Sequence, residues 1–164
     1  MKKITVLSFL LFCFLSSFAQ DATTYYLIRH AEKDRSDKTN SNPDLTKQGN
    51  ERAMKWSSVF QNVNFDAVYS TNYLRTIATA KPTALSQGLE IQFYDPRALY
   101  SKKFQKATSG KTVLVVGHSN TTPQFVNAIL EKRQFEDIKD NNNSNLYIVT
   151  QFQQESSVIL LKIE

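Results

Sequence analysis

The sequence predicts a three-layer α/β fold: a mostly parallel central sheet, helices on both faces, and an antiparallel hairpin at the C-terminal edge. Between about residues 24 and 130, strand-like runs alternate with helix-like segments, which is typical of a parallel sheet covered on both sides. Residues 146–152 and 158–163 then flank the polar segment 153–157, which predicts the hairpin. No repeat or linker is evident, so we expect residues 20–164 to form one domain.

Four short runs in the first part of this chain predict strands, because each is rich in β-branched and aromatic residues. Val113–Val116 is the most hydrophobic of them and is expected near the centre of the sheet. The four predicted strands are 24–29, 65–69, 90–94 and 113–116.

Helices are predicted between these strands. Apolar residues recur at helical spacing after Gly49, and Pro82 is expected to interrupt one helix or to open another. Thr121 and Thr122 precede Pro123, a pattern typical of a hydroxyl cap followed by proline at the first helical position. The predicted helices are 50–60, 72–80, 99–107 and 121–130.

Residues 1–19 have the pattern of a signal peptide. Lys2 and Lys3 precede an apolar run over residues 4–15, and the small residues Ser17 and Ala19 suit cleavage before Gln20. The run is short for a bilayer span, which needs about 20 apolar residues, although an uncleaved anchor remains the alternative. We therefore expect a periplasmic or secreted protein with no stable membrane association after cleavage.

Composition and charge narrow the classes of function. Lys and Arg number 20 and Asp and Glu 15, so the net charge of +5 becomes +3 once Lys2 and Lys3 are removed. This bias is too weak to indicate nucleic-acid binding, but it suits a small anionic substrate. Cys13, the only cysteine, lies in the signal segment, so the mature chain has no thiolate, and its two histidines show no metal-site spacing.

The two histidines, His30 and His118, each close a strand-like run. Arg29 precedes the first, and Arg75 lies near the start of a predicted helix after the second strand. The carboxyl ends of parallel strands meet at one edge of a sheet, so these side chains should converge there. Arginine forks and helix N-termini bind phosphate oxygens, and imidazole can attack or transfer protons. The sequence thus predicts an anion pocket that contains a nucleophile.

Both histidine segments resemble those of a known family. Leu27-Ile28-Arg29-His30-Ala31-Glu32 resembles the Arg-His-Gly/Ala signature of the histidine phosphatase superfamily, branch 1, which has the phosphoglycerate mutase-like fold. Val115-Val116-Gly117-His118-Ser119-Asn120 resembles the second-histidine segment of the same family.

Two further segments strengthen this resemblance. Asp44-Leu45-Thr46-Lys47-Gln48-Gly49, followed by Arg52-Ala53, is similar to the family's Leu-Thr-x-x-Gly-x-x-Arg/Gln-Ala segment. Ser70-Thr71-Asn72-Tyr73-Leu74-Arg75-Thr76, with Thr79-Ala80 and Pro82, is similar to its Ser-x-x-x-Arg-x-x-x-Thr-Ala-x-Pro segment. The four motifs stand in the family's order and cover roughly residues 25–130; in size the chain resembles the small phosphohistidine phosphatases.

The resemblance implies a role for each of the four main residues. His30 would attack phosphorus and carry the phosphoryl group, which water would then remove. Arg29, Arg75 and His118 would bind the phosphoryl oxygens, with His118 protonated and His30 neutral. No metal or other cofactor is implied, because the arginines and an imidazolium supply the positive charge.

The chain departs from the family pattern at the proton donor. The usual Leu-x-Glu element is Leu99-Tyr100-Ser101 here, so Asp95, near the exit of the third strand, becomes the candidate acid, with a turn residue as the alternative. Glu32 is a second candidate that could instead be a surface carboxylate. Lys33 could add charge to the pocket or be a solvated loop lysine, and Ser119 and Asn120 could contact phosphate.

Three functions fit these motifs. The leading one is an exported, metal-independent phosphatase that hydrolyses a small phosphate monoester through phospho-His30. The second is a phosphohistidine phosphatase acting on a protein, whose imidazole leaving group asks less of an acid. The third is a non-catalytic phosphate-binding module on the same fold.

Overall fold

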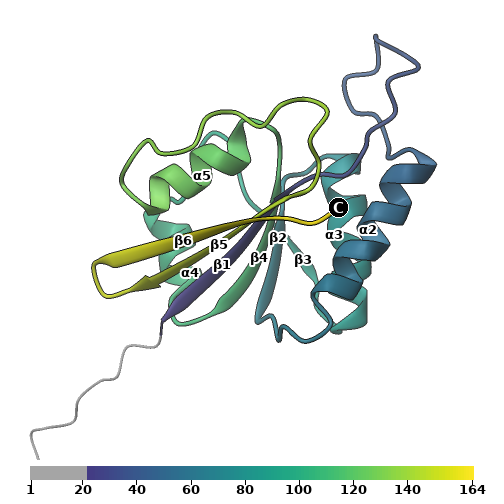
Figure 1. Cartoon of the computed structure of the whole chain (residues 1–164). Helices are drawn as coiled ribbons and strands as arrows, with labels where there is room; N and C mark the ends of the chain where they lie inside the picture. Colours follow the sequence, from purple (N-terminus) through teal and green to yellow (C-terminus); the bar gives the residue numbers. More distant parts are fainter. Residues whose placement is uncertain (1–21) are drawn as a thin grey trace, which may run out of the picture.

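The computed structural model describes residues 22–164, whose strands form a six-stranded sheet (Figure 1). Its order is β3-β2-β4-β1-β5-β6. The pairs β1–β4, β2–β4 and β2–β3 are parallel, whereas β5 runs antiparallel to both β1 and β6, so the predicted mixed sheet is confirmed. The strands are β1 (Thr23–Arg29), β2 (Ala67–Ser70), β3 (Ile91–Phe93), β4 (Thr112–Gly117), β5 (Asn145–Phe152) and β6 (Glu155–Lys162).

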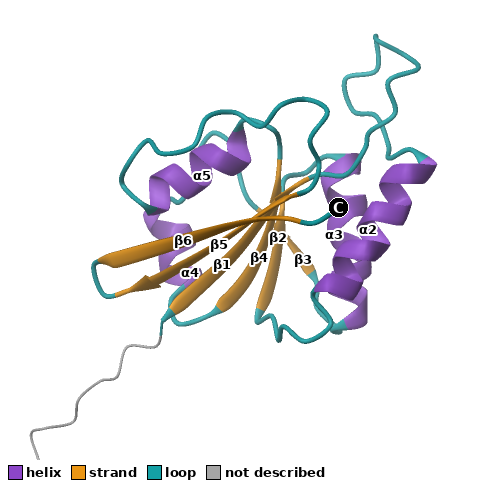
Figure 2. Ribbon diagram, viewed as in Figure 1, coloured by secondary structure: helices purple, strands orange, loops and turns teal. Residues whose placement is uncertain are grey.

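Helices cover both faces of the sheet, which gives the three predicted layers. In Figure 2, α2 and α3 lie on one side and α4 and α5 on the other. Each pair packs on its own hydrophobic cluster, because successive residues of a strand point to opposite faces. The helices are α2 (Lys47–Val59), α3 (Leu74–Ser86), α4 (Lys102–Thr108) and α5 (Thr121–Ile129).

Strand β4 lies inside the sheet, between β2 and β1, as its hydrophobicity predicted. Val115 faces the cluster that contains Phe125 of α5, whereas Val116 faces the cluster that contains Trp56 of α2. All four of these side chains are almost completely buried. A strand covered on both faces needs apolar residues at every position, which accounts for the continuous run.

In two helices the proline occupies a different position from the one predicted. Pro82 lies inside α3, which continues to Ser86 and does not break. The buried residues Ala80 and Ala84 on either side pack on the sheet, and this packing outweighs the one missing backbone hydrogen bond. Helix α5 begins at Thr121 with Asn120 as its N-cap, so Pro123 occupies the third helical position, where a backbone N–H has no partner within the helix.

The C-terminal hairpin has a shorter turn than residues 153–157. Only Gln153 and Gln154 separate β5 from β6, and Gln153 takes a left-handed φ of 55°. Strand β6 is the sheet edge and leaves Ile159, Leu160 and Leu161 exposed.

The predicted signal peptide over residues 1–19, with Cys13, lies outside the described residues. Within residues 22–164, no helix is both long enough and apolar enough to cross a bilayer.

Candidate active site

The parallel strands bring three distant segments to one edge of the sheet. Arg29 at the end of β1 pairs in register with Gly117 at the end of β4, and Ser70 at the end of β2 pairs with Val116. A cavity of about 440 Å³ opens beyond these strand ends. It is lined by Arg29, His30, Lys33, Tyr73, Arg75, Pro96, Arg97, His118, Ser119, Asn120, Thr121 and Asp140.

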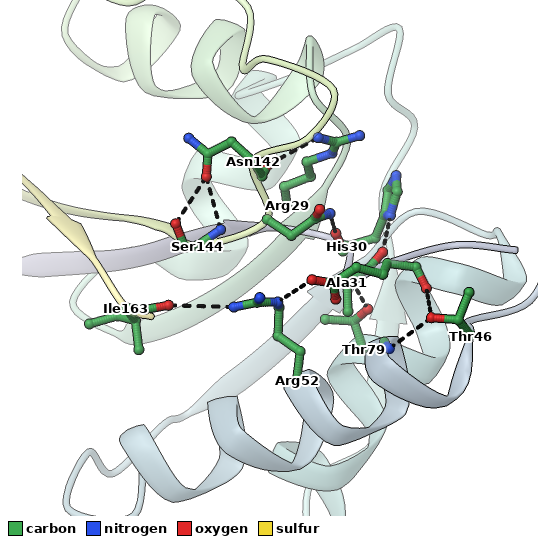
Figure 3. Close-up of polar contacts among 12 residues, drawn as sticks. Arg29, His30, Ala31, Thr46, Arg52, Thr79, Asn142, Ser144 and Ile163 are labelled. Carbon is green, nitrogen blue, oxygen red and sulfur yellow. Dashed lines mark hydrogen bonds and ion pairs between the residues drawn. The ribbon is translucent and has the colours of Figure 1, made fainter. Parts of the chain in front are cut away.

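His30 is held on both its backbone and its ring. Its backbone N–H donates to the Gly117 carbonyl (2.9 Å), and its own carbonyl accepts from the side-chain amide of Asn143 (2.8 Å). Ring atom Nδ1 lies 2.7 Å from the Ala31 carbonyl (Figure 3). A carbonyl only accepts, so Nδ1 carries the proton and donates, and Nε2 keeps its lone pair. That nitrogen is the one available to attack an electrophile in the cavity.

Burial and neighbouring cations keep the His30 ring neutral. The side chain is 3% exposed. Burial lowers its pKa to about 3, with further lowering by Arg29, His118 and Arg75 against the raising effect of the Ala31 carbonyl. A neutral imidazole at physiological pH is the form that a nucleophile requires.

His118 faces His30 across the cavity, with 5.5 Å between the ring centroids. Its Nε2 lies 2.9 Å from Oγ1 of Thr71, which in turn contacts Oγ1 of Thr76 (3.0 Å). Burial, then Arg75, Arg29 and Lys33, lower the pKa of His118 to about 4. His118 is therefore neutral at physiological pH, contrary to the expected imidazolium, because burial and then the surrounding positive charge disfavour a further cation.

Arg75 is the cation with the most unused hydrogen-bonding capacity in the cavity. Its Nε and one terminal nitrogen are buried without a hydrogen-bond partner among the described residues. The guanidinium carbon lies 4.6 Å from the centre of the Tyr73 ring, which positions the fork. Buried unpaired donors are costly, so this arrangement favours an incoming anion.

Arg29, by contrast, already uses both terminal nitrogens of its guanidinium to donate hydrogen bonds to protein groups. It donates to the carbonyls of Lys139, Asp140 and Asn142 (3.0 Å each) and to the Asp140 carboxylate (2.8 Å). Only its Nε is buried without a partner. Arg29 therefore holds the loop after α5 at the site and adds positive charge to the cavity. The sequence resemblance implied only a contact between Arg29 and phosphate.

Lys33, Ser119 and Asn120 also line the cavity. Asn120 caps α5, so the positive end of that helix lies at the cavity wall. In the part of the chain that the structure describes, no three His, Cys, Asp or Glu side chains gather as a metal site would need.

The structure does not bring Asp95 into this cavity. The side chain is 44% exposed, and both of its oxygens accept from the Arg97 guanidinium at 3.0 Å. Its Oδ1 also accepts from the Arg97 backbone N–H, so Asp95 is the turn residue that the sequence offered as the alternative. Arg97 and its own backbone hold the pKa of Asp95 below the usual range, which leaves no proton to donate.

Glu32 also lies outside the cavity. Its Oε1 accepts from Nε of Arg52 in α2 (2.7 Å), which links the loop after β1 to that helix (Figure 3). The Glu32 carbonyl lies so close to Gly49 that a Cβ there would come within 2.2 Å of the oxygen. This close approach explains why the Leu-Thr-x-x-Gly segment needs glycine at that position.

Sequence reasoning missed Tyr73, Arg97 and Asp140 as cavity residues. Tyr73 lies within the Ser-x-x-x-Arg segment, two positions before Arg75, and this proximity is the signal that could have marked it. Asp140 comes from an asparagine-rich loop that carries no readable pattern, and its carboxylate is held at the site by Arg29 and Arg35.

Comparison with known proteins supports the family suggested by the motifs. The sequence model of the histidine phosphatase superfamily (branch 1) matches residues 25–96. A sequence search of curated proteins found no match.

Several solved structures share the fold. A phosphoserine phosphatase mutant from Entamoeba histolytica, in complex with phosphoserine, is 15% identical, with a TM-score of 0.63 over 83% of this chain and 94% of the other. A protein assigned as a phosphohistidine phosphatase from Agrobacterium tumefaciens is 17% identical (TM-score 0.63, 87% and 99% covered). Phosphoglycerate mutase from Bacillus anthracis is 13% identical (TM-score 0.64, 87% and 94% covered).

The matched segment contains His30 and Arg75, and His118 completes the pair of facing imidazoles on the shared fold. Over residues 25–96 the chain is therefore similar to the histidine phosphatase superfamily, branch 1, and its fold is shared with solved phosphatases and a phosphoglycerate mutase.

Proposed function

We propose that this protein is a metal-independent phosphatase that hydrolyses a small phosphate monoester through a phosphohistidine intermediate on His30. The observation that carries the proposal is the state of His30: Nδ1 donates to the Ala31 carbonyl, which leaves the lone pair on Nε2 at a cavity rich in cations. Its pKa of about 3 keeps this nitrogen unprotonated.

The reaction would proceed in two phosphoryl transfers. Nε2 of His30 attacks phosphorus while the bond from phosphorus to the leaving oxygen breaks. The unpaired donors of Arg75 and the N-terminus of α5 stabilise the equatorial oxygens. Water then attacks phospho-His30 and releases inorganic phosphate. A dianionic phosphoryl group beside His118 would raise the pKa of that imidazole, so protonation of His118 would accompany substrate binding.

Phosphate esters are favoured over other anions because the site combines a nucleophile with convergent donors. Several proteins that share this fold are phosphatases by name, including the phosphoserine phosphatase from Entamoeba histolytica. A non-catalytic phosphate-binding module would not need one imidazole held neutral with its lone pair at the cavity.

A second candidate is a phosphohistidine phosphatase. Asp140 is the only carboxylate that lines the cavity within residues 22–164, and its pKa is held low by Arg35 and Arg29. An imidazole leaving group needs less protonation than an alkoxide, which suits a site without a carboxylic acid. Release of phosphate from a phosphorylated histidine-containing carrier protein, but not from phosphate monoesters, would favour this candidate.

The deciding experiment traps the intermediate. The wild-type chain is incubated with p-nitrophenyl phosphate in EDTA, quenched in alkali, and mapped by mass spectrometry. We expect phosphate on His30 and none on His118, with turnover unaffected by EDTA. Tight phosphate binding without turnover or a phosphoenzyme would support the binding module and refute the phosphatase.

Export is proposed from residues 1–19 alone. When the full chain is expressed in a bacterial host, we expect it to accumulate in the periplasm or medium with Gln20 as its first residue. A protein that keeps Met1 and sediments with membranes would support the uncleaved anchor.

A further inference from the structure

An alcohol leaving group needs a proton, and the cavity offers few donors. Arginines do not deprotonate at physiological pH, so Arg29, Arg75 and Arg97 are excluded. Asp140 is ionised beside Arg29 and Arg35, whose hydrogen bonds lower its pKa. His118 has a pKa lowered to about 4, its Nε2 lies 2.9 Å from Oγ1 of Thr71, and the proton that it gains on substrate binding serves to stabilise the phosphoryl oxygens. Of the cavity residues that carry a transferable proton, Lys33 and Tyr73 remain.

The backbone around Lys33 is anchored. Lys33 forms an isolated antiparallel bridge with Leu45. On one side the Thr46 N–H donates to the Glu32 carbonyl (2.9 Å), and on the other the Asp34 N–H donates to the Asp44 carbonyl (2.8 Å). The side chain therefore starts from a fixed point three residues after His30 and reaches the cavity wall.

The Lys33 side chain is partly buried and, within residues 22–164, has no carboxylate within ion-pairing distance. The groups that face it are Arg35 of its own loop, Arg75 of α3, Arg29 of β1 and Asp140 of the loop after α5, with His118 across the cavity. Burial, then Arg35, Arg75 and Arg29, lower its pKa, and Asp140 opposes them. An ammonium group in such surroundings gives up a proton more readily than a solvated lysine.

Resting on the phosphatase function proposed above, we infer that Lys33 is the general acid that protonates the leaving oxygen. As the bond from Nε2 of His30 to phosphorus forms and the phosphorus–oxygen bond breaks, one Nζ proton moves to that oxygen and the alcohol departs. The neutral amine then takes a proton from the water that attacks phospho-His30, which restores the ammonium. This assignment extends the substrate class to phosphate esters of ordinary alcohols.

Two substrates and two variants test this inference. p-Nitrophenyl phosphate has a leaving group that needs little protonation, whereas glycerol 2-phosphate releases an alkoxide. Lys33→Arg keeps the positive charge but holds its protons. With enzyme in excess, we expect Lys33→Arg to slow release of glycerol by about 10²-fold and release of p-nitrophenol by less than about threefold. In the wild-type chain the rate on glycerol 2-phosphate should fall at alkaline pH as Lys33 loses its proton. This fall should be absent from the pH–rate profile of Lys33→Arg.

Tyr73→Phe is the matched control, because Tyr73 is the other proton carrier in the cavity. We expect it to affect both substrates by the same factor. A loss confined to glycerol 2-phosphate in Tyr73→Phe would overturn the assignment. So would a Lys33→Arg variant that hydrolyses each substrate at the wild-type rate. Circular dichroism and thermal unfolding establish that both variants fold.

The outcomes for the two proposals are distinguishable. If the wild-type chain forms no phospho-His30 from either substrate, the phosphatase function fails. If it forms phospho-His30 but Lys33→Arg changes the rates on both substrates by the same factor, or changes neither, Lys33 does not donate the proton and this inference alone is wrong.

Discussion

The two histidine segments look alike in sequence but are held in different ways. Each imidazole follows a buried parallel strand, and each has its pKa lowered by burial, to about 3 for His30 and about 4 for His118. The His30 ring contacts the backbone carbonyl of the next residue, whereas the His118 ring contacts the hydroxyl of Thr71 from another strand end.

This difference in partner has a chemical consequence. A carbonyl only accepts, so it fixes His30 in one tautomer with a lone pair on the other nitrogen. A hydroxyl both donates and accepts, so Thr71 can accommodate His118 in either tautomer or as a cation. The first arrangement suits a nucleophile, and the second suits a group that gains charge when the phosphoryl group arrives.

The most severe test of this contrast is His30→Ala. We expect kcat on p-nitrophenyl phosphate to fall by about 10⁴-fold or more, because the covalent route is lost. No phosphoenzyme should be trapped. Residual turnover above about one hundredth of wild type would mean that His30 is not the nucleophile.

His118→Ala should be less damaging. We expect kcat to fall by about 10²- to 10³-fold, because one stabilising group is removed while the nucleophile stays. Rapid-quench measurements should still detect phospho-His30. A loss as deep as that of His30→Ala, with no phosphoenzyme, would erase the distinction between the two rings.

Acid should destabilise the fold through both imidazoles. Their folded pKa values lie below the ordinary value of 6.5, so the unfolded chain takes up protons first as the pH falls. Stability is therefore full above about pH 6.5 and is lost as the pH falls toward about 4 and 3. At pH 5 each ring should lower the free energy of unfolding by about 2 kcal/mol relative to neutral pH.

Urea unfolding at pH 7 and pH 5 measures this loss. His118→Gln should remove about half of the difference in unfolding free energy between the two pH values, because one of the two titrating rings is gone. An unchanged pH dependence in this variant would show that His118 is not held neutral by its surroundings.

The smallest expected effect belongs to Thr71→Val, which removes the hydroxyl without changing the shape. We expect kcat to fall by about five- to tenfold, since one hydrogen bond to His118 is worth about 1 kcal/mol. Thr108→Val is the control, because Thr108 is equally buried but bonds Tyr25, away from the cavity. If the control loses as much kcat as Thr71→Val, the effect reflects packing and not His118.

Much of this site could be predicted because Arg29, His30 and His118 lie at the ends of strands with continuous apolar sequences. The runs that end at Arg29 and Gly117 are continuous and apolar, and parallel strands place their carboxyl ends together. Asp95 illustrates the limit of that reasoning. It does follow β3, but a local turn and the neighbouring Arg97 capture its carboxylate, and the pattern of strands contains no information on such a contact.

The loop after α5 illustrates a second limit. Its residues 139–142 come to the site because Arg29 binds three of their carbonyls, an interaction between positions more than a hundred residues apart. Hydrophobic periodicity does not encode such contacts. The sequence could therefore not predict that the Arg29 guanidinium bonds this loop or that Asp140 lies at the cavity.

By itself the sequence determined the α/β class and the central place of the 113–116 strand and indicated the family, because strand hydrophobicity and motif order are local properties of the chain. Only the tertiary structure decided which nitrogen of His30 is free, that His118 is held neutral, and which charged groups share the cavity. These properties depend on burial and on partners distant in sequence, and such partners meet only when the sheet has formed.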